Sequence, residues 1–242
     1  MSLPYLACSR HSRWSQADFA ELAAFLGVEA FAGRPLPTDR MGLVLGRRET
    51  RLHVPGLPAA IWHPGFTAQR IRRAGVDTLV QALRLVAGET VLDATLGLGH
   101  DALVLRAAGA LVLGVECNPL LLFLTAEGHA GQPLGPPLHV RLGDFRDVLH
   151  AMEPRSIDHV YLDPLFPASE ASPGIWGTWA PVRAAGRPGR LTESDLALAA
   201  SRARRSVVVK RAPGEVPLAG PAAAPRIVRS IRSAYAVYSE SP

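Results

Sequence analysis

Four acidic residues in the middle of the chain each follow a short apolar or β-branched run. They are Asp93, Glu116, Asp144 and Asp163, and Asp101 comes soon after the first of them. In an open α/β sheet the carboxyl ends of parallel strands meet at one crevice, so we expect all five acids to line a common pocket. Carboxylates accept hydrogen bonds from hydroxyl and amino groups. The sequence therefore predicts a pocket for a ligand that carries positive charge, hydroxyls and an amine.

A glycine-containing turn follows the first of these runs and opens a helix. It reads Asp93-Ala-Thr95-Leu-Gly97-Leu-Gly99-His100-Asp101. Two glycines two positions apart let the backbone approach a ligand at a helix N-terminus. A nucleotide site presents such a turn to an anionic pyrophosphate, which a carboxylate at Asp93 would repel.

The turn and the acids together favour S-adenosylmethionine, a cationic ligand with ribose hydroxyls and an amine. We expect Glu116 to accept from the ribose hydroxyls, Asp144 to accept from the adenine amino group, and Phe145 to lie against the adenine ring. NAD remains the second candidate, because Gly97-x-Gly99-x-x-Ala102 followed by Glu116 also fits a dinucleotide site.

A second motif, Asp163-Pro164-Leu-Phe166-Pro, follows the fourth run. The lone pair of an exocyclic amine on a nucleobase is delocalised into the ring, so the amine is a poor nucleophile. Asp163 and the carbonyl of Pro164 can accept its N–H bonds and direct the lone pair toward a sulfonium methyl, while Phe166 stacks on the base. Such a site works by orientation and electrostatics.

The elements that must position these residues alternate between strands and helices. The near-continuous apolar runs are typical of strands buried on both faces. We expect strands over 90–93, 111–116, 139–144, 159–163 and 206–210, and closing antiparallel strands within 227–238. Helix start signals are Asp77, Asn118 with Pro119, and the capping-box sequence that starts at Thr192; another helix runs over 101–108. The helix begun at Asp77 is expected to carry Val86 and to stop at Gly88. The fold class is therefore α/β, a doubly wound, mostly parallel, Rossmann-like sheet of seven strands.

The beginning of the chain differs from this pattern. Residues 18–26 are typical of an amphipathic helix and residues 41–54 of a β-hairpin. We expect a small α+β N-terminal subdomain over residues 1–58 and the main domain over 59–242. Residues 164–190 show no periodic pattern, and a loop of that length is often functional.

Composition limits the classes of protein that this chain can represent. Its 242 residues are 48% hydrophobic, which is ample for a packed core, and its net charge is +5. Of the 26 basic residues only Lys210 is lysine, a bias that we attribute to genome composition. Two cysteines form no disulfide framework, the histidines show no metal spacing, and no signal peptide or membrane span is evident. We expect a cytoplasmic protein without a metal.

Residues 183–211 hold eight basic residues against two acidic ones, and two tryptophans, Trp176 and Trp179, come just before them. Arginines that contact phosphates and aromatic rings that stack on bases suit RNA. The expected phosphate contacts are Arg183, Arg187, Arg190, Lys210 and Arg211.

The motifs together resemble the class I S-adenosylmethionine-dependent methyltransferases. More narrowly, they are similar to the RsmJ-type small-subunit ribosomal RNA guanine-N2 methyltransferases and their uncharacterised bacterial relatives. The segments that carry the resemblance are 91–101, 114–119, 160–167 and 207–211, with 63–70 upstream. The chain departs from the RsmJ-type pattern at Ala168 and Ser169, where that pattern has His-Lys.

The resemblance implies transfer of a methyl group to an exocyclic amine of an RNA base, with guanine N2 of small-subunit ribosomal RNA as the first candidate. It places the turn residues His100 and Asp101, then Glu116 and Cys117, Asp144 and Phe145, and Asp163 at cofactor-binding positions. Three alternatives stay open: another amine in tRNA, protein or a small molecule; a catalytically silent RNA-binding relative; and an NAD-dependent oxidoreductase. The oligomeric state is not predicted.

Overall fold

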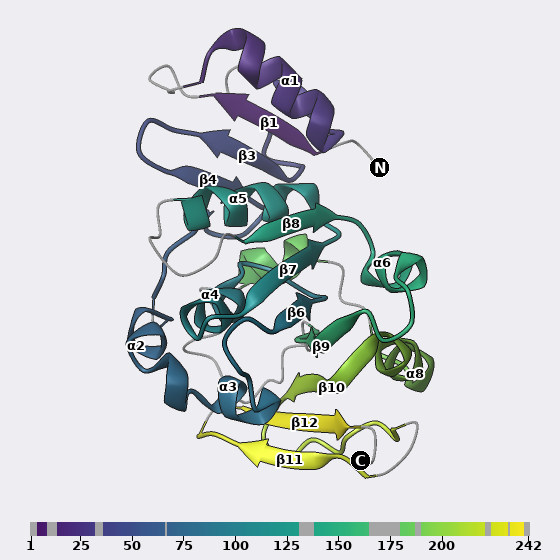
Figure 1. Ribbon diagram of the computed structural model, residues 1–242. Helices are drawn as coiled ribbons and strands as arrows, with labels where there is room; N and C mark the ends of the chain where they lie inside the picture. Colours follow the sequence, from purple (N-terminus) through teal and green to yellow (C-terminus); the bar gives the residue numbers. More distant parts are fainter. Residues whose placement is uncertain are drawn as a thin grey trace.

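The protein consists of two β-sheets, a small one at the N-terminal end and a larger one below it (Figure 1). The computed structural model describes residues 4–8, 14–31, 36–65, 67–130, 138–164, 180–186, 190–220, 224–231 and 233–239. The predicted residues Phe166, Ala168, Ser169, Trp176, Trp179 and Arg187 lie outside these ranges.

The larger sheet has seven strands in the order β11-β12-β10-β9-β6-β7-β8. Its strands are β6 (Thr90–Asp93), β7 (Leu111–Glu116), β8 (His139–Leu142), β9 (Ile157–Leu162), β10 (Ala203–Arg211), β11 (Arg226–Arg229) and β12 (Ala234–Ser239). Strands β8, β7, β6, β9 and β10 run parallel to one another. Strand β12 is antiparallel to both of its neighbours, β10 and β11. The predicted mostly parallel, seven-stranded α/β sheet with antiparallel closing strands is confirmed.

Helices cover both faces of this sheet (Figure 1). They are α2 (Thr67–Arg72), the 3-10 turn η1 (Ala74–Val76), α3 (Thr78–Leu83), α4 (His100–Ala107), α5 (Pro119–Ala130), α6 (Phe145–Ala151) and α8 (Glu193–Arg202). The predicted caps are present, because Asp77 and Asn118 accept from backbone N–H groups and Thr192 forms a capping box with Asp195. Helices α3 and α4 pack on one face and α6 and α8 on the other.

The central strands send alternate residues to the two faces, which explains their continuous apolar sequences. Val208 and Tyr161 pack in the core beneath α3 and α4, whereas Val207, Val209 and Leu162 pack in the core beneath α6 and α8. Because side chains two positions apart share a face, the residues that follow Tyr161 and Val208 by two, Asp163 and Lys210, lie on the α4 side.

The N-terminal unit is a five-stranded sheet in the order β2-β1-β3-β4-β5, with helix α1 (Gln16–Leu26) packed on it. Its strands are β1 (Tyr5–Cys8), β2 (Glu29–Phe31), β3 (Gly42–Leu45), β4 (Thr50–His53) and β5 (Ala60–Ile61). The expected helix and hairpin are present, whereas β1, β2 and β5 were not predicted. Strand β5 carries the sheet to Ile61, beyond the boundary expected near Pro58. Helix α5 joins both units, because its leucines share one core with the N-terminal sheet.

Three boundaries differ from the sequence predictions. Helix α3 ends at Leu83 because Arg84 adopts a left-handed conformation, so Val86 lies outside the helix and is exposed. Strand β8 ends at Leu142, and Asp144 instead caps α6. Residues 180–185, inside the expected long loop, are helical.

No helix in the described ranges has the length and apolar character needed to cross a membrane. In the same ranges, no three histidine, cysteine or acidic side chains gather in a way that would hold a metal ion.

Candidate active site

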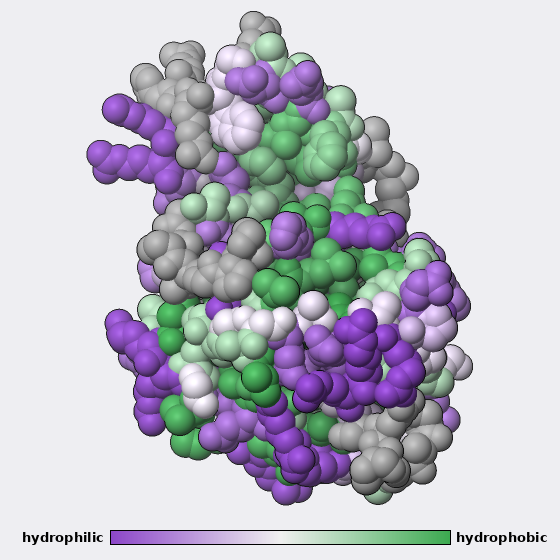
Figure 2. All heavy atoms as spheres, in the orientation of Figure 1, coloured by the Kyte–Doolittle hydropathy of each residue, from purple (hydrophilic) through white to green (hydrophobic). Residues whose placement is uncertain are grey.

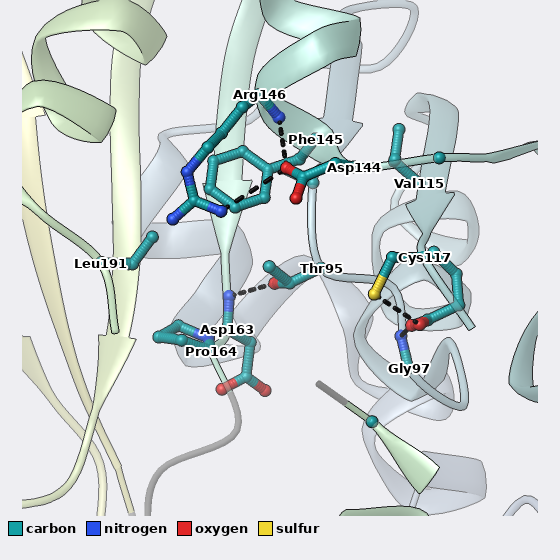
Figure 3. Close-up of a pocket in the computed structure, with 14 residues that line it drawn as sticks. Thr95, Gly97, Val115, Cys117, Asp144, Phe145, Arg146, Asp163, Pro164 and Leu191 are labelled. Atoms are coloured by element: carbon teal, nitrogen blue, oxygen red, sulfur yellow. Dashed lines mark hydrogen bonds and ion pairs between the residues drawn. The ribbon is translucent and has the colours of Figure 1, made fainter. Parts of the chain in front are cut away.

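A pocket opens at the carboxyl ends of β6, β7, β8 and β9 (Figure 3). The lining comes from residues at or just after the ends of these strands, from Gly186 after the helical residues 180–185, and from Leu191 just before α8. The lining residues are Ala94, Thr95, Gly97, Val115, Glu116, Cys117, Gly143, Asp144, Phe145, Arg146, Asp163, Pro164, Gly186 and Leu191. Seven of the predicted cofactor-binding residues therefore share one pocket: Thr95, Gly97, Glu116, Cys117, Asp144, Phe145 and Asp163.

Glu116 braces the glycine turn from the end of β7. Its Oε2 accepts a hydrogen bond from Gly97 N (2.9 Å) and its Oε1 accepts from Asn118 N (2.8 Å). Burial raises the pKa of this carboxyl, although the backbone N–H groups of Asn118 and Gly97 oppose the shift. A carboxylate has about four acceptor positions, and a third one here accepts from the Cys117 thiol (Sγ to Oε1, 3.6 Å). Because a thiol is a weak donor, this position and the remaining one on Oε2 can accept ligand hydroxyls.

Asp144 and Phe145 form the wall of the pocket at the start of α6 (Figure 3). Asp144 Oδ1 accepts from Arg146 N (2.9 Å) as the helix cap. The guanidinium of Arg146 lies 4.5 Å from the centre of the Phe145 ring and is held by two hydrogen bonds to Asp195 (2.6 and 2.9 Å). A cation over one face of an aromatic ring fixes the ring's position, which prepares Phe145 to contact a flat ligand.

Asp163 and Pro164 form the opposite wall of the pocket, at the end of β9. Asp163 N donates to Thr95 Oγ1 (2.6 Å), so the turn after β6 and the end of β9 are joined directly. Two of the three predicted catalytic residues therefore lie in the same pocket as the predicted cofactor-binding residues; the third, Phe166, lies outside the described ranges.

A network of charges supports Asp163 from behind. Lys210 Nζ donates to Asp163 Oδ2 (2.7 Å) and to Asp101 Oδ2 (2.8 Å). Asp101 also accepts from Tyr161 Oη (2.6 Å) and forms an ion pair with Arg70 of α2, which pairs with Asp77 as well. Burial would raise the pKa of Asp101, but the positive charges of Lys210 and Arg70 hold it well below its usual range.

Four predicted cofactor-binding residues do not line the pocket: Asp93, Gly99, His100 and Asp101. Asp93 is 2% exposed, and burial and the nearby Asp101 and Asp163 carboxylates raise its pKa well above the ordinary value. Its carboxyl is therefore not the exposed negative charge that the sequence suggested beside the ligand. Asp101 is occupied by the ion pairs just described. Of the five acids expected to line the pocket, three do so: Glu116, Asp144 and Asp163.

His100 and Gly99 belong to a packed aromatic cluster beneath the turn. His100 stacks on Trp62 (5.8 Å between ring centres), and Trp62 also meets the edge of His129 (5.7 Å). A Cβ on Gly99 would lie 2.7 Å from His129 Nε2, so glycine at this position allows close packing. Burial lowers the pKa of both His100 and His129 to about 4.

The residues predicted to contact RNA phosphates are separated by the fold. Arg190 is exposed and Arg183 is half-buried, whereas Arg211 is only 5% exposed. Lys210 points to Asp163 and Asp101, so neither Lys210 nor Arg211 is presented to a phosphate backbone. Figure 2 shows hydrophilic side chains projecting from the upper left, near the β3–β4 turn that carries the exposed Arg47 and Arg48.

Sequence reasoning missed Arg146 beside Phe145 and the role of Lys210 and Arg70 behind Asp163. The strand register contains the signal for Lys210, since Val209 pairs with Leu162 and the next two residues along are Lys210 and Asp163. Arg70 offers no comparable signal, because its contact with Asp101 spans two helices of unpredicted orientation.

Comparison with known proteins agrees with the motifs. A family profile described as "Putative SAM-dependent methyltransferase" matches residues 60–240. The chain is 34% identical to ribosomal RNA small subunit methyltransferase J of Alkalilimnicola ehrlichii, over 76% of this chain and 74% of that protein. It is 32% identical to the protein of the same name from Marinobacter nauticus, over 98% and 92%. It is also 31% identical to the uncharacterized protein YpiP of Bacillus subtilis, over 71% of each.

Among solved structures, the SAM-dependent methyltransferase NGO1261 from Neisseria gonorrhoeae superimposes with a TM-score of 0.69 at 22% identity, covering 97% of this chain and 95% of that one. This likeness confirms the fold, and the family match rules out the NAD-dependent oxidoreductase. The chain belongs to the S-adenosylmethionine-dependent methyltransferases, in the same family as the ribosomal RNA small subunit methyltransferases J.

Proposed function

We propose that this enzyme transfers a methyl group from S-adenosylmethionine to an exocyclic amine of an RNA base, with guanine N2 of small-subunit ribosomal RNA as the substrate. The observation that carries the proposal is the position of Asp163 and Pro164, which share one pocket with Glu116, Asp144 and Phe145. The relatives named ribosomal RNA small subunit methyltransferase J support the choice of RNA.

The residues on the β7 and β8 side fit the cofactor. Glu116 is 7% exposed and keeps acceptor capacity for ribose hydroxyls, while Asp144 and the braced Phe145 ring suit an adenine amino group and ring. Gly97 has a φ of +53°, and the nearest atom to its missing Cβ is Thr95 O at 4.0 Å, so backbone can lie close to the ligand there. Thr95 and Cys117 complete this side of the pocket. When bound, S-adenosylmethionine supplies an electrophilic methyl group on a sulfonium centre.

Asp163 and Pro164 orient the other reactant. Asp163 Oδ2 is held by Lys210, whereas Oδ1 receives no hydrogen bond within the described ranges. Oδ1 and the Pro164 carbonyl are therefore the acceptors for the two N–H bonds of an exocyclic amine. Accepting both turns the nitrogen lone pair out of the base plane and toward the methyl group, and the excess proton leaves to water after the N–C bond has formed. Orientation of this kind supplies much of the rate enhancement of a two-substrate reaction.

We propose further that arginines beside the pocket hold the RNA, chiefly the exposed Arg190, which precedes the pocket residue Leu191 in the chain. Arg183, which is half-buried, and Arg187, which lies outside the described residues, stay candidates from the sequence. A small-subunit RNA substrate places the reaction in the bacterial cytoplasm.

The test combines mapping and reconstitution. Deleting the gene is expected to remove one methylated guanine from small-subunit ribosomal RNA, detected by mass spectrometry of RNA fragments. The purified enzyme should then restore that methyl group on small subunits from the deletion strain, and Asp163→Asn should not. Loss of a tRNA or protein methylation, with unchanged ribosomal RNA, would contradict the proposed substrate and favour another amine.

A further inference from the structure

The only lysine of this protein stands behind the reacting pocket. Of 26 basic positions, 25 are arginine and one, position 210, is lysine. Lys210 lies near the end of β10, beside β9, in the register position next to Asp163. Arginine occupies all 25 of the remaining basic positions. Lysine occurs only where its ammonium lies between two carboxylates, those of Asp163 and Asp101.

We propose that Lys210 is a positioning residue for methyl transfer, whose ammonium holds the Asp163 carboxylate ionised and turned so that Oδ1 faces the amine. The inference rests on the proposed role of Asp163 as an acceptor for that amine. It is carried by the two short contacts of Nζ, 2.7 Å to Asp163 and 2.8 Å to Asp101, and by the 26% exposure of the lysine side chain. A partly buried ion pair is screened little by water and salt.

The surroundings of Asp163 would otherwise favour its neutral form. Burial raises its pKa, Lys210 opposes that shift, and the negative charge of Asp101 adds to it. Further titratable or charged groups face this cluster from five elements: Asp93 on β6, Arg70 on α2, His100 on α4, Tyr161 on β9 and Tyr235 on β12. Without Lys210, burial and the negative charge of Asp101 would act on Asp163 against only the more remote Arg70. A protonated carboxyl is a weaker acceptor for an amine N–H, because charge-assisted hydrogen bonds are the stronger ones.

Lysine suits this position better than arginine for a geometric reason. One ammonium is compact and has three donors, so it can reach two carboxylates from a single atom, as Nζ does here. A guanidinium is a larger, planar fork that reaches two carboxylates only from separate nitrogens, as Arg70 does with Asp77 and Asp101. Lys210→Arg therefore keeps the charge and loses the geometry, while Lys210→Met loses both.

The first arm of the test measures ionisation without catalysis. Protein labelled with ¹³C at aspartate side chains is titrated by NMR, with Asp163→Asn identifying the Asp163 signal. We expect the pKa of Asp163 to rise by at least one unit in Lys210→Met and to stay near the wild-type value in Lys210→Arg. Arg205→Gln, on the same strand but exposed and distant from the pocket, is the matched control and should change nothing. An unchanged Asp163 titration in Lys210→Met would overturn the inference.

The second arm measures single-turnover methyl transfer to small ribosomal subunits from pH 6 to pH 9. Below the raised pKa of Asp163, the rate of Lys210→Met should increase about tenfold per pH unit. Lys210→Arg should be slower than wild type by a constant factor, and both variants should bind S-adenosylmethionine within about twofold of wild type. If Lys210→Met loses the same factor at every pH, the residue is merely structural and the inference is wrong.

The two arms separate this inference from the proposed function. Wild-type protein that transfers no methyl group to small subunits would contradict the proposed substrate, and the NMR arm would still decide whether Lys210 sets the charge of Asp163. If Lys210→Met does not fold, Lys210→Gln removes the charge while keeping a hydrogen-bond donor, and the same outcomes apply.

Discussion

The two sides of the pocket are built in different ways. The cofactor side, defined as Thr95, Gly97, Glu116, Cys117, Asp144 and Phe145, is held by hydrogen bonds between a side chain and nearby backbone. The acceptor side, defined as Asp163, Pro164 and the network of Lys210, Asp101 and Arg70 behind them, is held by ion pairs between distant parts of the chain. Glu116 binds N–H groups at positions 97 and 118, whereas Lys210 reaches Asp101 across 109 residues.

Because the two sides are supported differently, we expect them to control different properties of the enzyme. On the cofactor side, backbone N–H groups hold the Glu116 and Asp144 carboxylates, and one ion pair, Arg146–Asp195, lies beside the Phe145 ring. The acceptor side depends on the balance between two cations and several acids, so its state depends on protonation. Changes on the cofactor side should therefore appear in binding affinity, and changes on the acceptor side should appear in rate and its pH dependence.

The largest binding effect is expected from Glu116→Ala. Loss of a pair of charge-assisted hydrogen bonds to the ribose should weaken S-adenosylmethionine binding by roughly 2–4 kcal/mol. Calorimetric titration measures it, and Glu127→Ala, on the adjacent helix α5 but not lining the pocket, serves as the control. An unchanged affinity in the Glu116 variant would show that the cofactor does not bind through this carboxylate.

The cluster beneath the glycine turn should make folding stability fall in acid. The folded pKa values of His100 and His129 are about 4, against roughly 6.5 in an unfolded chain, so the unfolded state binds more protons between these limits. The stabilisation is then fully present above pH 6.5 and decreases as the pH falls toward 4, by about 2 kcal/mol per histidine and so about 4 kcal/mol for the two together at pH 5.

Urea unfolding at pH 7 and pH 5 measures this loss, and His129→Gln should reduce it by about half. An equal loss in the variant and in wild type would assign the acid sensitivity to the ion pairs of the acceptor side instead.

Comparing Gly97→Ala with Gly99→Ala distinguishes a glycine that leaves room for a ligand from a glycine that the packing of the fold requires. Both glycines have positive φ, +53° and +67°, but a Cβ at Gly97 makes only an ordinary contact with Thr95 O (4.0 Å), while one at Gly99 meets His129 and Thr125 within 2.8 Å. Gly99→Ala should therefore destabilise the fold by about 2 kcal/mol more than Gly97→Ala, because crowding adds to the backbone strain. Equal unfolding free energies in thermal or urea denaturation would contradict the assigned packing.

The smallest effect is expected for single surface arginines. If Arg190 contacts a phosphate, Arg190→Gln should flatten the log–log dependence of RNA affinity on salt by somewhat less than one unit. Filter binding at several salt concentrations measures this slope in Arg190→Gln and in Arg48→Gln, which lies on the β3–β4 turn. A slope that changes only in the Arg48 variant would move the RNA surface to the N-terminal sheet.

The sequence predicted the strands of the larger sheet and the helix caps well, because their signals are local. The caps at Asp77, Asn118 and Thr192, the apolar strands and the glycine turn each lie within a few residues of what they determine. The strands β1, β2 and β5 were missed because they are only two to four residues long, and β1 pairs with segments more than twenty residues away. Asp93 and Asp101 were placed in the pocket because strand position alone does not distinguish a buried or ion-paired acid from one that faces a ligand.

The most direct test of the role of Asp163 compares the rate of methyl transfer with the affinity for S-adenosylmethionine in Asp163→Ala. We expect the rate of single-turnover methyl transfer to small ribosomal subunits to fall by far more than tenfold, while the affinity for S-adenosylmethionine changes much less. A rate within about tenfold of wild type, equivalent to only ~1.4 kcal/mol of barrier, would contradict the assignment of Asp163 to the reacting amine. A parallel loss of cofactor affinity large enough to explain the rate would contradict the division of the pocket into two sides.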